Sequence, residues 1–367
     1  MLRAKPLNIL FLTYQGDVAG STHSIAYLSK GLAHKGHNIY VGIRRESLLW
    51  SLLDNSKVKR VAMTFRGKFD FENWRQIRDV VQEYNIQIIN AQSSHDRYTS
   101  IFSRWRYGLN TKIIHTRRQM PLCIKNPVQN YLYNQRTDGI VAVSKQVAKG
   151  LVNIGIKPSQ IEIIYNGTPR EKYEHINDSL TAQLKSDLKI NEDDFVIGCV
   201  SRPKNQIQII EALALLKQPV TMIFCGLEAT EEMNQIINNY KLEHTIHFIG
   251  QVEGKDVLSY YGLFDLKILA STMEGLSQSL LEAMALGIPV IGTAFAGNLD
   301  LIEDDENGLF FKDGDIQTLA EQIEKLRNSK ELRSKLSKAG KETALEKFSI
   351  ENTIRNYEEY FYQLIED

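Results

Sequence analysis

The sequence predicts an α/β protein with two doubly wound domains, each built on a parallel sheet. Short apolar runs alternate with amphipathic, helix-like segments, which is the pattern of strand–helix–strand units. A polar stretch at residues 161–179 interrupts this alternation, which then begins again. A length of 367 residues agrees with two domains, because single hydrophobic cores rarely grow beyond about 250–300 residues. We therefore expect domains at 1–168 and 169–348, and a separate helix at 349–367.

The first domain begins with an apolar run, NILFLTY at 8–14, which we interpret as a buried strand. The run is too short to cross a membrane and lacks the cleavage site of a signal peptide. An amphipathic segment, THSIAYLSKGLAHKG, and a second apolar run, NIYVGI, complete one strand–helix–strand unit. Three more helix-like segments, each followed by an apolar run, extend the expected sheet: RQIRDVVQEYN with IQIINA, FSRWRYG with TKIIHT, and VQNYLYNQR with GIVAVS.

The second domain repeats this pattern from residue 194 onward. Its apolar runs are DFVIGCV, VTMIFCG, TIHFIG, LKILAS and IPVIGT, and its helix-like segments include QIQIIEALALLK, EEMNQIINNYKL and LAEQIEKLRN. The tail IENTIRNYEEYFYQLIE is also helix-like. Open parallel sheets bind ligands at the carboxyl ends of their strands. We therefore expect the functional site in a cleft between the two domains.

Charge is unevenly distributed along the chain, although the net charge is zero. Residues 1–170 contain 25 Lys and Arg against 10 Asp and Glu, and the remaining residues contain 19 against 34. A basic half favours an anionic partner, such as an acidic membrane surface or a charged glycan, unless the charges are simply scattered and solvated. We do not expect nucleic acid as a partner, because the sequence contains no aromatic-rich RNA-binding motif and no evident DNA-reading helix.

Three cysteines, Cys123, Cys199 and Cys225, lack the spacing of a metal site. Two of them lie in apolar runs of the second domain, so we expect buried free thiols rather than disulfides. Free thiols fit the reducing cytoplasm. We expect no metal and no other cofactor.

The stretch EGLSQSLLEAMALGIPVIGT at 274–293 contains two glutamates eight positions apart. Ser279 and Glu282 have the spacing of a helix capping box, in which the serine caps the helix and the glutamate reaches back to it. A capping box would explain Glu282 without any functional role.

Glu274 has no such structural explanation. It follows the apolar run LKILAS, precedes the expected helix and lies next to the flexible Gly275. The backbone amides of Leu276 and Ser277 would point into the same space, as amides at a helix N-terminus do. A carboxylate beside free amides would bind hydroxyl and phosphate oxygens, as in a sugar that is linked to phosphates.

The segment EGLSQSLLEAMALGIPV resembles the Glu-x7-Glu segment of the family-four retaining glycosyltransferases, which have the GT-B fold. The resemblance extends over essentially the whole chain. VAVSKQVAKGLVNIGIKPSQIEIIYNGT looks like the end of the family's first domain, and SRPKNQIQIIEAL, FCGLEA, HFIGQV and NGLFFKDGDIQTLAEQI also fit its pattern. The resemblance implies two Rossmann-like domains that face each other across a cleft, with a final helix that crosses back to the first domain.

The resemblance also implies the reaction. The family transfers a sugar from a nucleoside diphosphate to a hydroxyl acceptor, with retention of anomeric configuration and usually without a metal. The first domain binds the acceptor and the second the nucleotide. On this chain, Glu274 would bind hydroxyls of the donor sugar and Glu282 the ribose hydroxyls, while the backbone of Gly275, Leu276 and Ser277 would lie near the sugar or diphosphate.

Arg202 and Lys204 would neutralise the departing diphosphate, since fixed cations stabilise negative charge where it develops. Only Pro203 separates them, whereas the family usually has four or more residues there, so their joint contact with the diphosphate is less secure. Gly16 and Gly20, after the first apolar run, loosely match the family's glycine pair. This turn either approaches the donor or simply connects a strand to a helix.

His95 follows the apolar run IQIINA and resembles a family histidine near the donor sugar. At a position where the family often has histidine, this chain has Arg118. Arg117 and Arg118 belong to a group of basic and aromatic residues that are close in sequence: Arg104, Trp105, Arg106, Tyr107, Lys112, Arg117, Arg118 and Lys125. We expect one surface here that binds an anionic acceptor, through Arg117 and Arg118, or the inner face of the cytoplasmic membrane.

The expected function is therefore a retaining glycosyltransferase of cell-surface polysaccharide or lipopolysaccharide assembly, with a uridine or guanosine diphosphate sugar as donor and a glycan or lipid-linked glycan as acceptor. Two alternatives remain. A glycoside hydrolase also uses two carboxylates, but these flank the scissile bond at about 5–9.5 Å from each other. A non-catalytic relative would bind nucleotide without transfer; the short Arg–Lys spacing favours it, and the two glutamates oppose it.

Overall fold

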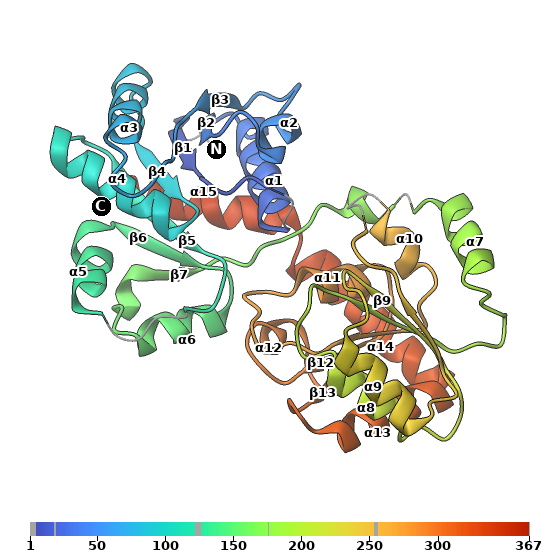
Figure 1. Ribbon diagram of the computed structural model, residues 1–367. Coiled ribbons are helices and arrows are strands. Elements are labelled where there is room, and N and C mark those ends of the chain that lie inside the picture. Colours follow the sequence, from blue (N-terminus) through green and yellow to red (C-terminus); the bar gives the residue numbers. More distant parts are fainter. Residues whose placement is uncertain (1–4, 18–19, 122–125, 175, 253–255, 367) are drawn as a thin grey trace. The chain divides into compact units, whose positions relative to one another are not determined.

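The computed structural model describes residues 5–17, 20–121, 126–174, 176–252 and 256–366 (Figure 1). The chain divides into two compact units, one formed by Met1–Pro169 with Ser349–Asp367 and the other by Arg170–Phe348. Each unit contains a sheet whose described strand pairs are all parallel, with helices in the connections. The predicted class, two doubly wound α/β domains, is confirmed.

The sheet of the first unit has the strand order β3-β2-β1-β4-β5-β6-β7. Its strands are β1 (Asn8–Leu12), β2 (Asn38–Ile43), β3 (Lys59–Ala62), β4 (Ile88–Ala91), β5 (Lys112–Arg117), β6 (Gly139–Ala142) and β7 (Ile161–Ile163). Its helices are α1 (Gly20–His34), α2 (Leu48–Leu52), α3 (Phe71–Glu83), α4 (Ser94–Tyr107), α5 (Pro127–Arg136), α6 (Lys145–Asn153), the short η1 (Pro158–Gln160) and α15 (Ile350–Glu366).

The central strand of this sheet, β1, is buried on both faces, as expected for a parallel sheet between helices. Ile9 and Phe11 belong to the hydrophobic core on the side of α1 and α15. Leu10 and Leu12 belong to the core on the side of α3 and α4. Because side chains alternate along a strand, a continuous apolar run supplies both cores at once.

The last helix of the chain, α15, packs against α1 of the first unit (Figure 1). The two helices approach closely at Gly31, where an added Cβ would lie 2.1 Å from Cδ1 of Ile354. The connection is held by a bridge between Thr168 and Ser349, and by a hydrogen bond of 2.7 Å from the Gly167 amide to the Thr353 hydroxyl. Residues almost 190 positions apart therefore belong to one unit.

The sheet of the second unit has the strand order β10-β9-β8-β11-β12-β13. Its strands are β8 (Val196–Val200), β9 (Thr221–Cys225), β10 (Thr245–Phe248), β11 (Leu266–Leu269), β12 (Val290–Thr293) and β13 (Leu309–Phe311). Its helices are η2 (Arg170–Tyr173), α7 (Asp178–Asp187), α8 (Ile207–Leu213), α9 (Glu231–Tyr240), α10 (Val257–Tyr261), α11 (Gln278–Ala285), α12 (Asn298–Leu301), α13 (Ile316–Asn328), α14 (Lys330–Glu342) and the π-helical turn η3 (Thr343–Lys347).

Each sheet has a topological switch point, at which successive connections lead to opposite edges. In the first unit this point lies between β1 and β4, and in the second between β8 and β11. Loops that leave adjacent strands in opposite directions separate there and open a crevice at the carboxyl end of the sheet. The loops after these four strands contain most of the residues that the sequence singled out.

Candidate functional site

In the second unit, the loop after β8 and the loop after β11 bring Lys204 and Glu274 into contact. The Lys204 ammonium donates a hydrogen bond to Oε1 of Glu274 and forms an ion pair with it. The Lys204 side chain is 26% exposed and that of Glu274 17%, so water reaches both. Two oppositely charged groups that are 70 positions apart in sequence thus share one partly open corner.

The loop that contains Glu274 is held by the backbone at Gly297. The Gly297 amide donates to the Glu274 carbonyl at 3.1 Å. A Cβ added at Gly297 would lie 2.0 Å from the carbonyl oxygen of Gly275 and 2.9 Å from the Leu276 nitrogen. Only a residue without a side chain permits this approach of two backbone segments. Leu276 and Ser277 follow as buried residues directly before α11.

The turn with Arg202 and Lys204 is held by a residue that the sequence analysis missed. The fully buried side chain of Gln206 donates 2.7 Å hydrogen bonds to the Ser201 hydroxyl and the Arg202 carbonyl, and accepts one from the Lys204 amide. The Arg202 side chain is exposed. The sequence signal for this role was the glutamine two residues after the Arg-Pro-Lys sequence.

The predicted capping box of Ser279 and Glu282 is wrong. Helix α11 begins at Gln278, and the hydroxyl of Ser277 accepts the capping hydrogen bond from the Leu280 amide at 3.4 Å. Because the helix begins earlier than expected, Glu282 lies in its second turn and cannot reach back to the cap.

Glu282 is instead bound by two side chains from other elements. Lys172 of η2 donates to its Oε1, and the hydroxyl of Tyr261 lies 3.1 Å from its Oε2 and 3.0 Å from the Ser279 carbonyl. Burial, and then the charge of Glu282, raise the pKa of Tyr261 well above its usual range. The tyrosine therefore stays protonated and donates to the carboxylate.

A buried cation, Lys267, lies in the middle of β11. It is fully buried, and its ammonium donates to the Ile268 carbonyl at 2.7 Å. Burial lowers its pKa, and the nearby Cys199, Cys225, Glu274 and Glu282 oppose this shift only in part. A lysine inside the apolar run LKILAS was a signal that the sequence analysis did not use.

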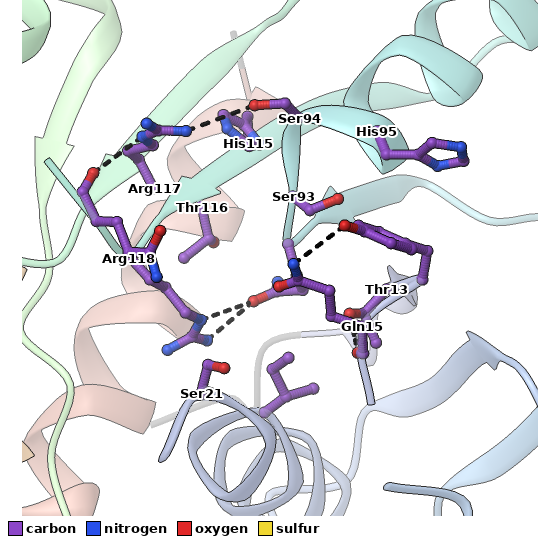
Figure 2. A pocket seen from close by; sticks show the side chains of 14 residues that line it. Thr13, Gln15, Ser21, Ser93, Ser94, His95, His115, Thr116, Arg117 and Arg118 are labelled. Carbon is purple, nitrogen blue, oxygen red and sulfur yellow. Dashed lines mark hydrogen bonds between the residues drawn. The ribbon is translucent and has the colours of Figure 1, made fainter. Parts of the chain in front are cut away.

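The first unit contains a polar cavity of about 260 Å³ at the carboxyl ends of β1, β4 and β5 (Figure 2). Its lining residues are Thr13, Tyr14, Gln15, Ser21, Ile25, Gln92, Ser93, Ser94, His95, His115, Thr116, Arg117, Arg118 and Gln119. The structure thus brings together His95, Arg117 and Arg118. Gly16 does not line the cavity; its Cα faces Ser47, whose Cβ would lie 2.7 Å from an added Cβ.

His95 lies in the first turn of α4, with its ring between two aromatic residues. The ring centroids of Tyr14 and Phe65 lie 5.0 and 6.1 Å away. Its Nδ1 is 3.7 Å from the carboxylate of Asp96, and neither ring nitrogen has a hydrogen-bond partner among the described residues. Burial raises the pKa of Asp96, although the neighbouring His95 and Ser93 and the Tyr14 amide, which donates to its carboxylate at 2.9 Å, oppose this shift.

Among the described residues, the basic group expected around α4 and β5 does not form one continuous surface. Lys112 begins β5 and Arg117 ends it. The two residues therefore lie about 16 Å apart, at about 3.3 Å per residue, at opposite ends of this strand. Arg104 is a structural residue that forms an ion pair with Asp138 and donates to the Arg136 carbonyl at 2.6 Å. Trp105 is 75% exposed at the end of α4. Lys125 lies outside the described residues.

The predicted free, buried thiols are confirmed for Cys199 and Cys225, and burial raises the pKa of Cys225 to about 12. Cys123 lies outside the described residues. In the described part of the chain, three or more His, Cys, Asp or Glu side chains nowhere converge as metal ligands would. Across the same residues, the helices are too short or too polar to span a bilayer.

His115 of β5 makes the stability of the first unit depend on pH. Burial, and then the charges of Arg97 and Arg117, hold its pKa well below its usual range. The ring is therefore neutral in the folded protein, with its Nδ1 donating to the Ala91 carbonyl at 3.2 Å. In the unfolded chain this ring binds a proton below pH of about 6.5. Stability is therefore lost as the pH falls below this value.

His115→Asn should remove this pH dependence and keep the donor to Ala91. Between pH 7.5 and 5.5 we expect the wild type to lose about 1.4 kcal/mol more unfolding free energy than the variant. Urea denaturation followed by tryptophan fluorescence measures this difference, because all three tryptophans, Trp50, Trp74 and Trp105, belong to the first unit. Equal losses in both proteins would show that His115 is not the titrating group.

Comparison with known proteins places this geometry in a family. Residues 181–343 match the family model of the glycosyl transferases group 1, and residues 18–172 match that of glycosyltransferase family 4. EpsD of Bacillus subtilis (strain 168), which is named as a glycosyltransferase, is 30% identical over 315 residues, 79% of this chain and 80% of EpsD. The capsular polysaccharide biosynthesis glycosyltransferase CapM of Staphylococcus aureus is 26% identical over 221 residues, 57% of each chain.

Among solved structures, HepE of Anabaena in complex with UDP has a TM-score of 0.83 at 21% identity and covers 97% of this chain and 100% of HepE. It has also been solved with UDP-glucose. At this identity the likeness shows the fold, and the two family models together with EpsD show the family. The chain therefore belongs to the family-four glycosyltransferases and has the two parallel-sheet α/β domains of the GT-B fold.

Proposed function

We propose that this glycosyltransferase transfers a sugar from a nucleoside diphosphate sugar to a hydroxyl of a glycan or lipid-linked glycan, with retention of configuration and without a metal. The observation that supports the proposal most directly is the contact between Glu274 and Lys204 at the switch point of the second unit. The complexes of HepE with UDP and UDP-glucose support a nucleotide-sugar donor.

Binding of the donor would change the partner of Lys204. Its ammonium now contacts the Glu274 carboxylate. A diphosphate offers more negative charge than one carboxylate, so Lys204 would move to the phosphates, with the exposed Arg202 beside it. Glu274 would then be free to accept hydrogen bonds from hydroxyls of the sugar. The charge that develops on the leaving diphosphate would be stabilised by cations already in place.

Retention would follow from attack on the same face that the diphosphate leaves. The acceptor hydroxyl forms the new bond to the anomeric carbon as the bond to the diphosphate breaks, and a phosphate oxygen takes the proton. This route needs no protein nucleophile. His95 is proposed to lie near the donor sugar, and the backbone at Gly275–Ser277 near the diphosphate.

The biological setting is proposed from the relatives. CapM is named for capsular polysaccharide biosynthesis. We propose the same class of process for this chain, the assembly of a cell-surface polysaccharide or lipopolysaccharide in the cytoplasm. Peripheral contact with an anionic membrane remains a prediction, and absence of sedimentation with anionic vesicles at low salt would contradict it.

Donor binding tests the proposal. We expect one of UDP, GDP or ADP, or a sugar derivative of it, to raise the melting temperature of the protein, because a ligand that binds only the folded state stabilises it. Glu282→Gln should weaken the affinity for that nucleotide about tenfold, or ~1.4 kcal/mol, because a charged acceptor for the ribose hydroxyls is lost.

Glu232→Gln is the matched control, since Glu232 is an exposed glutamate in the first turn of α9 in the same unit. It should bind the nucleotide as the wild type does. If no nucleoside diphosphate or nucleotide sugar changes the melting temperature, the proposed donor class is wrong. If Glu282→Gln binds normally, the assignment of Glu282 to the ribose is wrong.

A further inference from the structure

The cavity of the first unit has an unusual charge composition for a sugar-binding site. Among its described lining residues there are two arginines and two histidines, and none is Asp or Glu. The nearest carboxylate noted above, that of Asp96, faces the backbone of Tyr14, whose amide donates to it at 2.9 Å. A ligand in this cavity therefore meets positive charge.

The two arginines differ in what they already bind. Arg117 donates to the carbonyls of Gln119 and Met120 at 2.9 and 3.2 Å and so holds the following loop. Arg118 donates from Nε and Nη2 to a single acceptor, the amide oxygen of Gln92, at 3.3 and 2.9 Å (Figure 2). Its Nη1 is buried and has no hydrogen-bond partner among the described residues. The positive charge of Arg118 is thus held by a neutral amide.

A chain of buried hydrogen bonds sets the orientation of that amide. Gln92 donates from Nε2 to Oδ1 of Asn90 at 2.9 Å, and the Thr116 hydroxyl donates to the same oxygen at 2.8 Å. The hydroxyl of Tyr357, in α15, lies 3.1 Å from that of Thr116. Since Thr116 uses its proton on Asn90, Tyr357 must donate to Thr116. All four side chains are buried.

The direction of these bonds has a consequence for Arg118. Because the Gln92 nitrogen is committed to Asn90, its oxygen must face the other way, toward the guanidinium. Arg118 is thereby held in place without being neutralised. A half-buried cation that is bound only to a neutral amide raises the free energy of the folded protein, because a charge removed from water requires a charged partner. A ligand in the cavity would supply that counter-charge.

We propose that this cavity binds an anionic group of the acceptor, a carboxylate or a phosphate ester, through Arg118, and that Gln92 is the residue that positions Arg118. The proposal rests on the proposed function, together with the expectation from the family resemblance that the first domain binds the acceptor. Hydroxyls of Ser21, Ser93 and Ser94 line the same cavity and supply further donors. A guanidinium suits such a group, because its paired N–H donors match carboxylate and phosphate oxygens.

Direct binding of small anions tests this site without any donor or transfer. The probes are inorganic phosphate and succinate, titrated into the full-length protein in a calorimeter at low ionic strength. We expect the wild type to bind at least one of them saturably and Arg118→Gln to bind it at least tenfold more weakly. Arg106→Gln removes an exposed arginine of α4 outside the cavity and should bind as the wild type does.

Two further variants separate a site from a loss of folding. Gln92→Glu has the same size but places a negative charge against Arg118 and removes the donor to Asn90, so it should lose anion binding; nucleotide binding that stays at the wild-type level would show that this variant is folded. Arg118→Lys keeps the charge without the planar fork and should bind with intermediate affinity. Tighter binding of phosphate would indicate a phosphate ester on the acceptor, and tighter binding of succinate a carboxylate.

The proposal is overturned if neither anion binds saturably, or if Arg106→Gln weakens binding as much as Arg118→Gln. Nucleotide binding in the same samples distinguishes this result from failure of the proposed function. A protein that binds a nucleoside diphosphate but neither anion would keep the donor site and lose only the acceptor site.

Discussion

Replacing Glu274 by glutamine is expected to remove most of the sugar-transfer activity while the protein stays folded. The change removes the charge that binds Lys204 and the proposed acceptor for hydroxyls of the donor sugar. Removal of one well-placed electrostatic contact from a reaction centre typically costs a factor on the order of 10²–10³ in kcat, about 3–4 kcal/mol. Release of nucleoside diphosphate from the donor sugar, with and without a panel of acceptors, measures the loss.

Glutamine has nearly the size of glutamate, and the Glu274 backbone bond to Gly297 does not involve the side chain. The melting temperature should therefore change little. Donor affinity should fall less than kcat does, because Lys204 becomes free to bind the diphosphate. Glu232→Gln serves as the control with unchanged turnover. Normal turnover of the Glu274→Gln variant would show that Glu274 does not have its proposed role in the mechanism.

Gly297→Ala should damage the same loop through the backbone. The new methyl group would lie 2.0 Å from the carbonyl oxygen of Gly275, and backbone atoms cannot rotate away as a flexible side chain can. Overpacking of this kind typically costs about 1–3 kcal/mol. We expect a melting temperature several degrees lower, and a loss of transfer comparable to that of Glu274→Gln, because the peptide beside Glu274 has to move.

Thermal unfolding and turnover together measure this effect. Leu299→Ala is the control in the same segment, because Leu299 is 44% exposed and its truncation should leave both quantities close to the wild type. A Gly297→Ala protein that melts and turns over like the wild type would mean that the loop at Gly275 adapts without cost.

The sequence was sufficient for the central strands but not for the two edge strands of the first sheet, β3 and β7. Strands such as β1 and β9 are buried on both faces, so they appear as continuous apolar runs. The edge strand β3, KRVA, is only half-buried and contains two charged residues, so no run marks it. The strand β7 lies in the stretch that the polar composition assigned to a linker, and two of its three residues are exposed.

The start of α11 was also predicted wrongly from the sequence. Ser277 and Ser279 are both good N-caps, and sequence spacing favoured Ser279 because of Glu282. The backbone selected Ser277. Glu282 is bound instead by Lys172 and Tyr261, which come from other elements and which no local sequence pattern could reveal.

By itself, the sequence determined that two parallel α/β domains form, and that Glu274 lies in a loop at the carboxyl end of a strand. Both follow from local periodicity and from the general rule that the loops after parallel strands lie together at the carboxyl ends of those strands. Only the tertiary structure decided which charges meet. It brought Lys204 to Glu274, separated Lys112 from Arg117, and linked Tyr357 through buried hydrogen bonds to Arg118. Such contacts depend on strand order and helix docking between residues far apart along the chain.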